Sequence, residues 1–363
     1  MLLEKIIAKC LPHLKWAPEQ DLSLLPQART KEGLWVDPVE FLRLINAWSL
    51  ALWALRLSQL LCPWALPAPK RGRPPIYSDV SVFLTSIVAG AWRLSYEGIT
   101  DWLARYEALA LALGYDQRDE DGRLKTISLA QYSRRVRNLG LLPYFLFFIA
   151  LVVALIRLGL IKGYDLIIDS SLLQAWYKDD PDARWSYPNR RKGSIFGYKI
   201  HSIICRWSYL PVFFVITPAN INDGSLAIPM LAATVLLYGF QVLFVRADAA
   251  YFNYDFLGFI KEVLHASPII DYNLRRKGKK FLATLFFLHQ WREATRPRSN
   301  IERTFAWLKR YFGLKDFQVQ GIIAVTRYAF QVHIAMLAVA VIAARYQRPE
   351  LATSRSKVLA FTR

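Results

Sequence analysis

The order of apolar runs after residue 160 constrains the fold of this chain most. Five short runs rich in Ile, Val, Leu and Phe are bounded by turn residues, which is typical of strands. They cover residues 164–173, 197–205, 210–219, 241–248 and 267–273. The spacing of apolar residues predicts helices at 224–238, at 254–265 and from residue 299 onward. Three strands followed by alternating helices and strands predict an α/β domain, with a mixed five-stranded sheet flanked by helices.

The part of the chain before this sheet has only helical patterns. Ser78 can cap a helix through SDVSVFLTSIVAGAW, Ser95 can open another through SYEGITDWLARYEALALAL, and a third carries SLAQYSRRVRNL. The proline-punctuated CPWALPAPKRGRPP is typical of a linker. We therefore expect an all-α N-terminal region before the sheet domain. The expected boundaries are an N-terminal helical region at 1–70, a second helical region at 71–160, the sheet domain at 161–345 and a basic tail at 346–363.

Charge indicates the kind of partner. The chain has 47 Lys and Arg against 28 Asp and Glu, a net charge of +19, which suits a polyphosphate or, alternatively, an anionic membrane surface. Arg134, Arg135 and Arg137 cluster on the third expected helix, so residues 71–160 form either a DNA-reading helix-turn-helix or a helical pair with a solvated basic helix. The short KRGRPP either enters a minor groove or is an ordinary linker.

Two uncharged stretches, 138–156 and 328–344, approach the length of a membrane span. Gly140 and Pro143 interrupt the first, and Gln331 and His333 the second, which favours buried helices over membrane spans. The three cysteines and five histidines are scattered and form no metal-binding or disulfide pattern. A reducing cytoplasm fits this cysteine usage, and a metal would have to be held by carboxylates, which favours magnesium or manganese.

Two aspartates follow the apolar runs of expected strands. Asp169 follows the apolar run LII of the first strand, and Asp248 follows the fourth. If these strands are neighbours, both carboxylates emerge near one end of the sheet, where open α/β sheets place their sites. Their mutual repulsion would be relieved by a shared divalent cation. The alternative is that each is an ordinary strand-end or capping residue.

A third carboxylate, Glu302, lies in a strongly basic helical segment, SNIERTFAWLKR. At about 100° per residue, an apolar stripe forms that should pack on the sheet. The stripe consists of Ile301, Phe305, Leu308 and Phe312. Arg298, Glu302 and Lys309 share a second stripe roughly 70° away. This predicts that Glu302 completes the metal site while the two cations hold phosphates. Alternatively, Glu302 forms a capping box with Ser299.

At these residues the sequence resembles the DDE transposases of bacterial insertion sequences, whose catalytic domain has a ribonuclease-H-like fold. The resemblance spans about residues 160–340 and rests on IIDSSLL, GYKIH, TPANINDGSLAIPML, RADAAYFNYDFL and RSNIERTFAWLKRYFGL. It implies that Asp169, Asp248 and Glu302 hold two magnesium ions, which manganese can replace. Arg298 and Lys309 match the arginine and lysine of the family's tyrosine-arginine-glutamate-lysine pattern. Thr295 replaces the tyrosine, which leaves open whether a hairpin intermediate forms.

The resemblance implies a transposase that cleaves double-stranded DNA at terminal inverted repeats and joins it to target DNA, as a homodimer at the nucleoid, away from membranes. A ribonuclease-H-like nuclease or an inactive domesticated DNA-binding regulator is the alternative. Further candidate DNA contacts are Arg303, Arg310, Lys199 and His201, although strand alternation explains the last two equally well. Asn222 and Asp223 are expected to shape the turn before the helix, with a catalytic role as the alternative. Asp179, Asp180 and Asp182 are expected to lie in a solvated loop.

Overall fold

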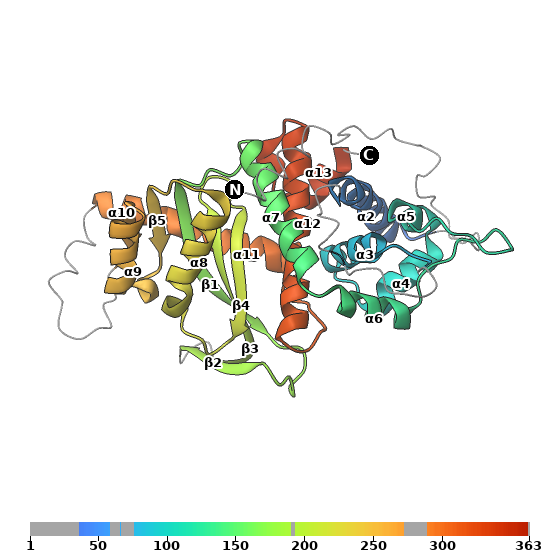
Figure 1. Ribbon diagram of the computed structural model, residues 1–363, viewed down its shortest axis with the longest axis horizontal. Helices are drawn as coiled ribbons and strands as arrows, with labels where there is room; N and C mark the ends of the chain where they lie inside the picture. Colours follow the sequence, from blue (N-terminus) through green and yellow to red (C-terminus); the bar gives the residue numbers. More distant parts are fainter. Residues whose placement is uncertain (1–35, 59–65, 67–75, 190–192, 272–288, 362–363) are drawn as a thin grey trace. The chain divides into compact units, whose positions relative to one another are not determined.

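A computed structural model of the chain describes residues 36–58, 66, 76–189, 193–271 and 289–361 (Figure 1). The KRGRPP segment and most of the expected linker lie outside these residues. The chain forms two compact units. The first contains the described residues between 156 and 310 together with 317–326. The second contains the described residues before 156 together with 311–316 and those after 326. The four-region division expected from the sequence stays a prediction.

The first unit is built on a mixed sheet of six strands. These are β1 (Asp165–Gln174), β2 (Arg184–Asn189), β3 (Gly193–Cys205), β4 (Pro211–Pro218), β5 (Phe244–Ala247) and β6 (Ser267–Ile270). β3 runs antiparallel to β1, β2 and β4, whereas β1, β5 and β6 are parallel. This order is that of a ribonuclease-H-like fold, so the predicted fold class is confirmed. The sheet has one strand more than the five expected, because β2 pairs with the first half of β3.

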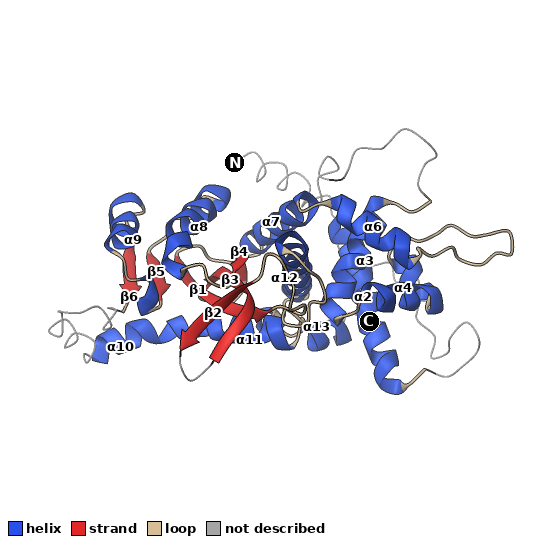
Figure 2. Cartoon of the chain, turned by 90° about the horizontal axis from the view of Figure 1, so that it is seen from below, coloured by secondary structure: helices blue, strands red, loops and turns tan. Residues whose placement is uncertain are grey.

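Helices cover both faces of this sheet, as Figure 2 shows. α8 (Asp223–Tyr238) and α9 (Tyr254–Gly258) lie on one face, and α10 (His289–Thr295) and α11 (Asn300–Arg310) on the other. A π-helical turn follows α9, and a 3₁₀ turn at Arg296–Ser299 joins α10 to α11. The apolar stripe expected on α11 is buried. Because side chains of a strand alternate between the faces, neighbouring residues of β1 serve different helix layers.

The second unit is helical. Its elements are α2 (Pro38–Leu57), α3 (Asp79–Trp92), α4 (Tyr96–Arg105), α5 (Glu107–Ala112), α6 (Leu129–Leu139), α7 (Leu142–Arg157), α12 (Ile322–Arg345) and α13 (Arg355–Phe361), with the unit boundary falling inside α7 and α12. Ser78 and Ser95 cap α3 and α4 through their hydroxyls, as expected. The single helix expected after Ser95 is broken at Tyr106, whose backbone is extended.

The two uncharged stretches form the long apolar helices α7 and α12. By length and composition α12 could cross a membrane, and α6 with α7 passes the same test only as a pair bent by 69°. In α12, however, 78% of the most apolar window is buried inside the structure. Such burial is typical of a core helix of a large domain and favours a buried helix over a membrane span.

Candidate metal and DNA site

Asp169 and Asp248 lie beside each other because their strands are paired. β1 and β5 run parallel, and Ile168 lies opposite Ala247. The next residue on each side, Asp169 and Asp248, therefore lies at the same height along the two strands. The guanidinium Nη1 of Arg298 lies 3.9 Å from Asp169 Oδ2 and 4.0 Å from Asp248 Oδ2. The structure therefore brings two of the candidate acids together around one cationic group.

The two carboxylates differ in burial. The Asp169 side chain is 17% exposed, and burial raises the pKa of its carboxyl group to about 7, because a buried charge loses its hydration. The amide of Ser170, 2.8 Å from Asp169 Oδ1, and the charge of Arg298 offset only part of this increase in pKa. Asp248 is 48% exposed and accepts a hydrogen bond from the amide of Ala249. Asp169 thus carries a poorly compensated charge that a divalent cation would stabilise.

Glu302 lies in the first turn of α11, and its side chain is exposed. Within the described parts of the chain, no three His, Cys, Asp or Glu side chains gather closely enough to hold a metal ion. The pair of aspartates alone fits magnesium, which commonly takes one or two protein carboxylates and fills its other positions with water and phosphate oxygens. Ser299, the expected capping partner, donates its hydroxyl to the carbonyl of Arg296. Glu302 as the third ligand stays a prediction.

The basic side chains of α11 that are expected to bind phosphates differ from one another in burial. Lys309 donates from Nζ to Ser171 Oγ and to the carbonyl of Leu172, both at 2.7 Å, and so ties α11 to β1. Burial lowers the pKa of Lys309 to about 8. Arg303 and Arg310 are exposed on α11, and the guanidinium of Arg303 lies 5.4 Å from the ring centre of Tyr209. Arg303 and Arg310 are accordingly the more accessible cations of this helix.

Lys199 and His201 lie on the sheet face that α8 covers. Lys199 Nζ is 2.9 Å from Asp223 Oδ1 and donates to the carbonyl of Ile221. His201 is 1% exposed, and its Nε2 is 2.9 Å from the hydroxyl of Thr217. Burial lowers the pKa of His201 to about 4, so the ring is neutral at physiological pH. Both side chains lie in a polar network around Asp223, which the sequence indicated as a turn residue with a catalytic role as the alternative.

The expectation of a solvated acidic loop is wrong for two of its three aspartates. Asp180 is 3% exposed and accepts hydrogen bonds from the Tyr198 hydroxyl at 2.6 Å and the amide of Gly321. Asp182 accepts from the amide of Ile322 at 2.8 Å. These amides are at the N-terminus of α12, where negative charge is favourable. The carboxylates of Asp180 and Asp182 therefore start a helix, while Asp179 is exposed.

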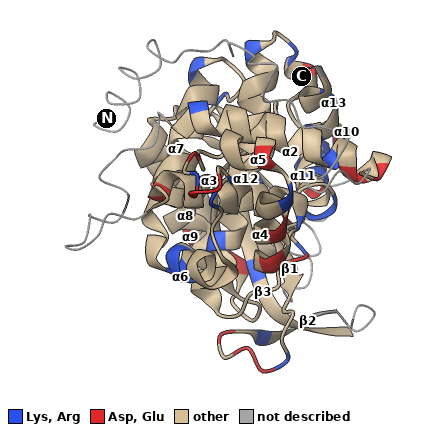
Figure 3. Ribbon diagram, turned by 90° about the vertical axis from the view of Figure 1, so that its right-hand side faces the viewer, with Lys and Arg blue, Asp and Glu red and all other residues tan. Residues whose placement is uncertain are grey.

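The three arginines of α6 also differ. Arg135 donates to the carbonyl of Tyr77 and lies 2.5 Å from Asp79 Oδ1, so it fastens α6 to the start of α3. Arg134 and Arg137 are exposed, and Figure 3 shows the basic residues of α6 in blue. Only these two remain accessible for a phosphate backbone.

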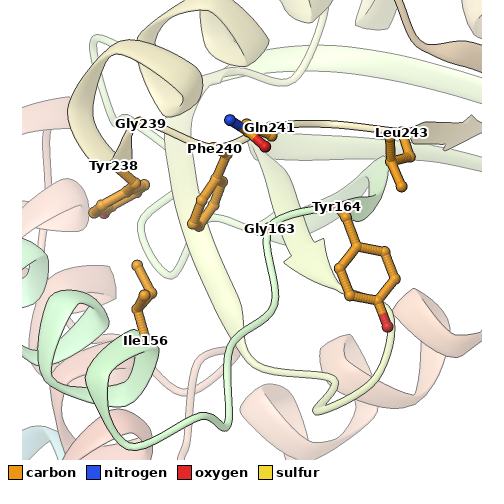
Figure 4. Close-up of a pocket in the computed structure, with 8 residues that line it drawn as sticks. All are labelled: Ile156, Gly163, Tyr164, Tyr238, Gly239, Phe240, Gln241 and Leu243. Carbon is orange, nitrogen blue, oxygen red and sulfur yellow. The ribbon is translucent and has the colours of Figure 1, made fainter.

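A shallow pocket of about 500 Å³ lies elsewhere in the first unit (Figure 4). Its lining includes Tyr164, Tyr238 and Phe240, and none of its lining residues is a candidate site residue. It therefore has no part in the site described above.

The strand order, with Asp169 inside β1 and Asp248 directly after β5, defines a ribonuclease-H-like domain. Residues 162–338 match the family model described as the transposase DDE domain. This part of the chain belongs to that family, so the resemblance to DDE-type transposases is confirmed. Comparisons with curated proteins and with solved structures gave no significant match. A transposase domain implies DNA as the partner, and DDE transposases generally use a divalent metal.

Proposed function

We propose that the protein is an active transposase that hydrolyses a phosphodiester at each end of its element and directs the freed 3′-hydroxyl into target DNA. This proposal rests on the positions of Asp169 and Asp248, whose carboxylates both lie next to the guanidinium group of Arg298. Both proposed steps are in-line phosphoryl transfers, in which the nucleophile is water or a DNA hydroxyl rather than a protein side chain.

The proposed roles follow from burial and charge. Asp169 and Asp248 hold magnesium or manganese, and Glu302 in the first turn of α11 is the proposed third ligand. A bound divalent cation supplies positive charge to the attacking and leaving oxygens of the transfer. Arg298, whose fork of donors matches a phosphate, binds the DNA backbone next to the aspartates. Lys309 holds α11 against β1 and so keeps the α11 arginines in place.

The proposed partner is double-stranded DNA, first the terminal inverted repeats and then the target. A homodimer in the bacterial cytoplasm, at the nucleoid, would pair the two ends. The net charge of +19 supports a nucleic-acid partner, because released counterions contribute strongly to such binding.

Nick mapping tests this function. The full-length protein is incubated with magnesium and DNA that carries the sequences flanking its own gene, and the positions and end groups of the nicks are mapped. We expect magnesium-dependent nicks with 3′-hydroxyl ends at defined positions, followed by joining to a target plasmid. Nicks without joining would instead favour a related nuclease. DNA binding with no cleavage in magnesium or manganese would favour a DNA-binding regulator and contradict the proposal.

The exposed arginines of α6 give a separate prediction about DNA binding. Replacing Arg134 and Arg137 together by alanine should reduce the slope of log affinity against log salt by about two, since each phosphate contact contributes roughly 0.9. Gel-shift titrations at several salt concentrations measure this slope. The control is Arg105→Ala on α4, an exposed arginine paired with Asp101. An unchanged slope in the double variant would show that α6 is only a solvated basic helix.

A further inference from the structure

Asp223 lies in a polar network on the α8 face of the sheet. It is the first residue of α8, directly after Asn222, whose side chain caps the helix by accepting from the amide of Gly224. Asp223 Oδ1 accepts a hydrogen bond from Ser170 Oγ at 2.9 Å and lies 2.9 Å from Lys199 Nζ. The helix cap is thus provided by Asn222, and the carboxylate of Asp223 is left to bind the sheet.

The pairing of β1 with β3 explains why these groups meet. Ser170 lies opposite His201, and Leu172 lies opposite Lys199, so both polar residues of β3 share a face with Ser170. His201 Nδ1 is 3.8 Å from Asp223 Oδ1, but the ring is neutral, because burial and the charge of Lys199 both lower the pKa of His201. Lys199 is therefore the cation that balances Asp223 in this network.

Asp169 points to the opposite face of the same strand, where Arg298 lies. The two faces are connected through Ser170. Its amide donates to Asp169 Oδ1 at 2.8 Å, while its hydroxyl donates to Asp223 Oδ1. Ser170 thus binds the carboxylate of Asp169 through its backbone amide, and it binds the carboxylate of Asp223 through its side-chain hydroxyl.

We propose that Asp223 is a positioning residue, which acts through Ser170 to fix the carboxylate of Asp169 in the orientation that binds a divalent cation. This inference rests on the proposed function, because it assumes that Asp169 is a metal ligand. Residues that orient metal ligands contribute to metal affinity without touching the ion. The position of Asp223 behind the strand, bonded to Ser170 and Lys199, is that of such a residue.

Calorimetric titration of the full-length protein with Mn²⁺ tests the inference without relying on activity. Ser170→Ala and Asp223→Ala should each weaken Mn²⁺ binding about 10- to 100-fold, the usual effect of removing a residue that orients a ligand. Asp223→Asn retains an acceptor for the serine hydroxyl and should weaken binding less than Asp223→Ala. Ser170→Ala removes only a hydroxyl, so it keeps the test valid if the loss of Asp223 destabilises the fold around Lys199.

Asn222→Ala is the matched control. It removes the side-chain cap of α8, which lowers stability, but it leaves the groups around Ser170 intact. Its Mn²⁺ affinity should equal that of the wild type. An equal loss in Asn222→Ala and Ser170→Ala would overturn the inference, because the effect would then be general loosening of α8.

Asp169→Asn distinguishes a failure of the positioning role from a failure of the proposed metal site. If Asp169→Asn weakens Mn²⁺ binding while Ser170→Ala and Asp223→Ala do not, the positioning role is wrong and the metal site stands. If Asp169→Asn binds Mn²⁺ as the wild type does, the proposed metal site fails and the positioning role fails with it.

Discussion

Replacing Asp248 by asparagine will abolish magnesium-dependent cleavage of DNA and leave DNA binding nearly unchanged. The substitution keeps the shape of the side chain but removes a charge that holds the metal, and metal stabilisation of a transition state is worth several kcal/mol. At 1.4 kcal/mol per factor of ten, the expected loss in rate is roughly a thousandfold or more. Cleavage of end DNA measures the rate, and a gel-shift assay measures binding.

Asp255→Asn provides the control for this experiment. Asp255 is an exposed aspartate in the first turn of α9, a few residues after Asp248, and it is no part of the candidate site. Its variant should cleave DNA at the wild-type rate. Wild-type cleavage by Asp248→Asn as well would remove Asp248 from the site.

Asp165 and Asp169, four residues apart on the same face of β1, should affect stability in opposite directions. Asp165 is 1% exposed and lies 2.8 Å from both Arg246 Nε and Arg206 Nη1. Replacing it by asparagine leaves the guanidinium of Arg246, which is 5% exposed, without its counterion. Breaking a buried ion pair from one side typically costs 3–5 kcal/mol, so we expect a loss of about that size in urea unfolding. Arg206, 27% exposed, should matter less, so Arg206→Gln is the milder comparison.

Asp169→Asn, in contrast, should stabilise the protein when no divalent cation is present. The pKa of Asp169 is about 7 in the folded protein, against 3.8 for a free aspartate, so the folded state binds more protons between these values. The stability of the wild-type protein therefore falls as the pH rises from about 4 to 7 and is lowest above 7. Since asparagine does not titrate, the advantage of the variant grows over this window and reaches up to roughly 4 kcal/mol.

Urea unfolding at pH 5 and pH 8, both with a chelator, measures this advantage. We expect a larger gain for Asp169→Asn at pH 8 than at pH 5. A loss of stability at pH 8 would mean that burial does not raise the pKa of Asp169 and that its charge is already compensated.

Most of the sheet follows from the sequence, because five strands are apolar runs ended by turn residues. β2 (RWSYPN) has no such run and contains Pro188, so its strand character comes from pairing with β3 and could not be predicted locally. The break between α4 and α5 at Tyr106 is similar, since neither glycine nor proline marks it. Both features depend on tertiary contacts rather than on local preference.

Part of the candidate site could also be predicted from the sequence. Asp169 and Asp248 could be paired from the sequence because each follows the apolar run of one of two neighbouring strands, although β1 continues to Gln174 beyond its pairing with β5. The stripe that linked Arg298 to Glu302 assumed 100° per residue, but Arg298 lies in a 3₁₀ turn, which advances about 120° per residue. The contact of Asp223 with Ser170 could not be predicted, because the two residues are 53 positions apart and lie on different elements. The helix-starting role of Asp182 depends on a contact across 140 residues and leaves no local signal.

The most direct test of the account is whether Asp169 and Asp248 bind the same ion. Mn²⁺ affinity is measured by calorimetry for the wild type, Asp169→Asn, Asp248→Asn and the double variant. We predict that each single variant weakens Mn²⁺ binding at least about tenfold. The double variant should lose much less binding free energy than the sum of the two single losses, because the effects of side chains that share one ion are not additive. Strictly additive losses, or unchanged affinity in either single variant, would contradict a shared site.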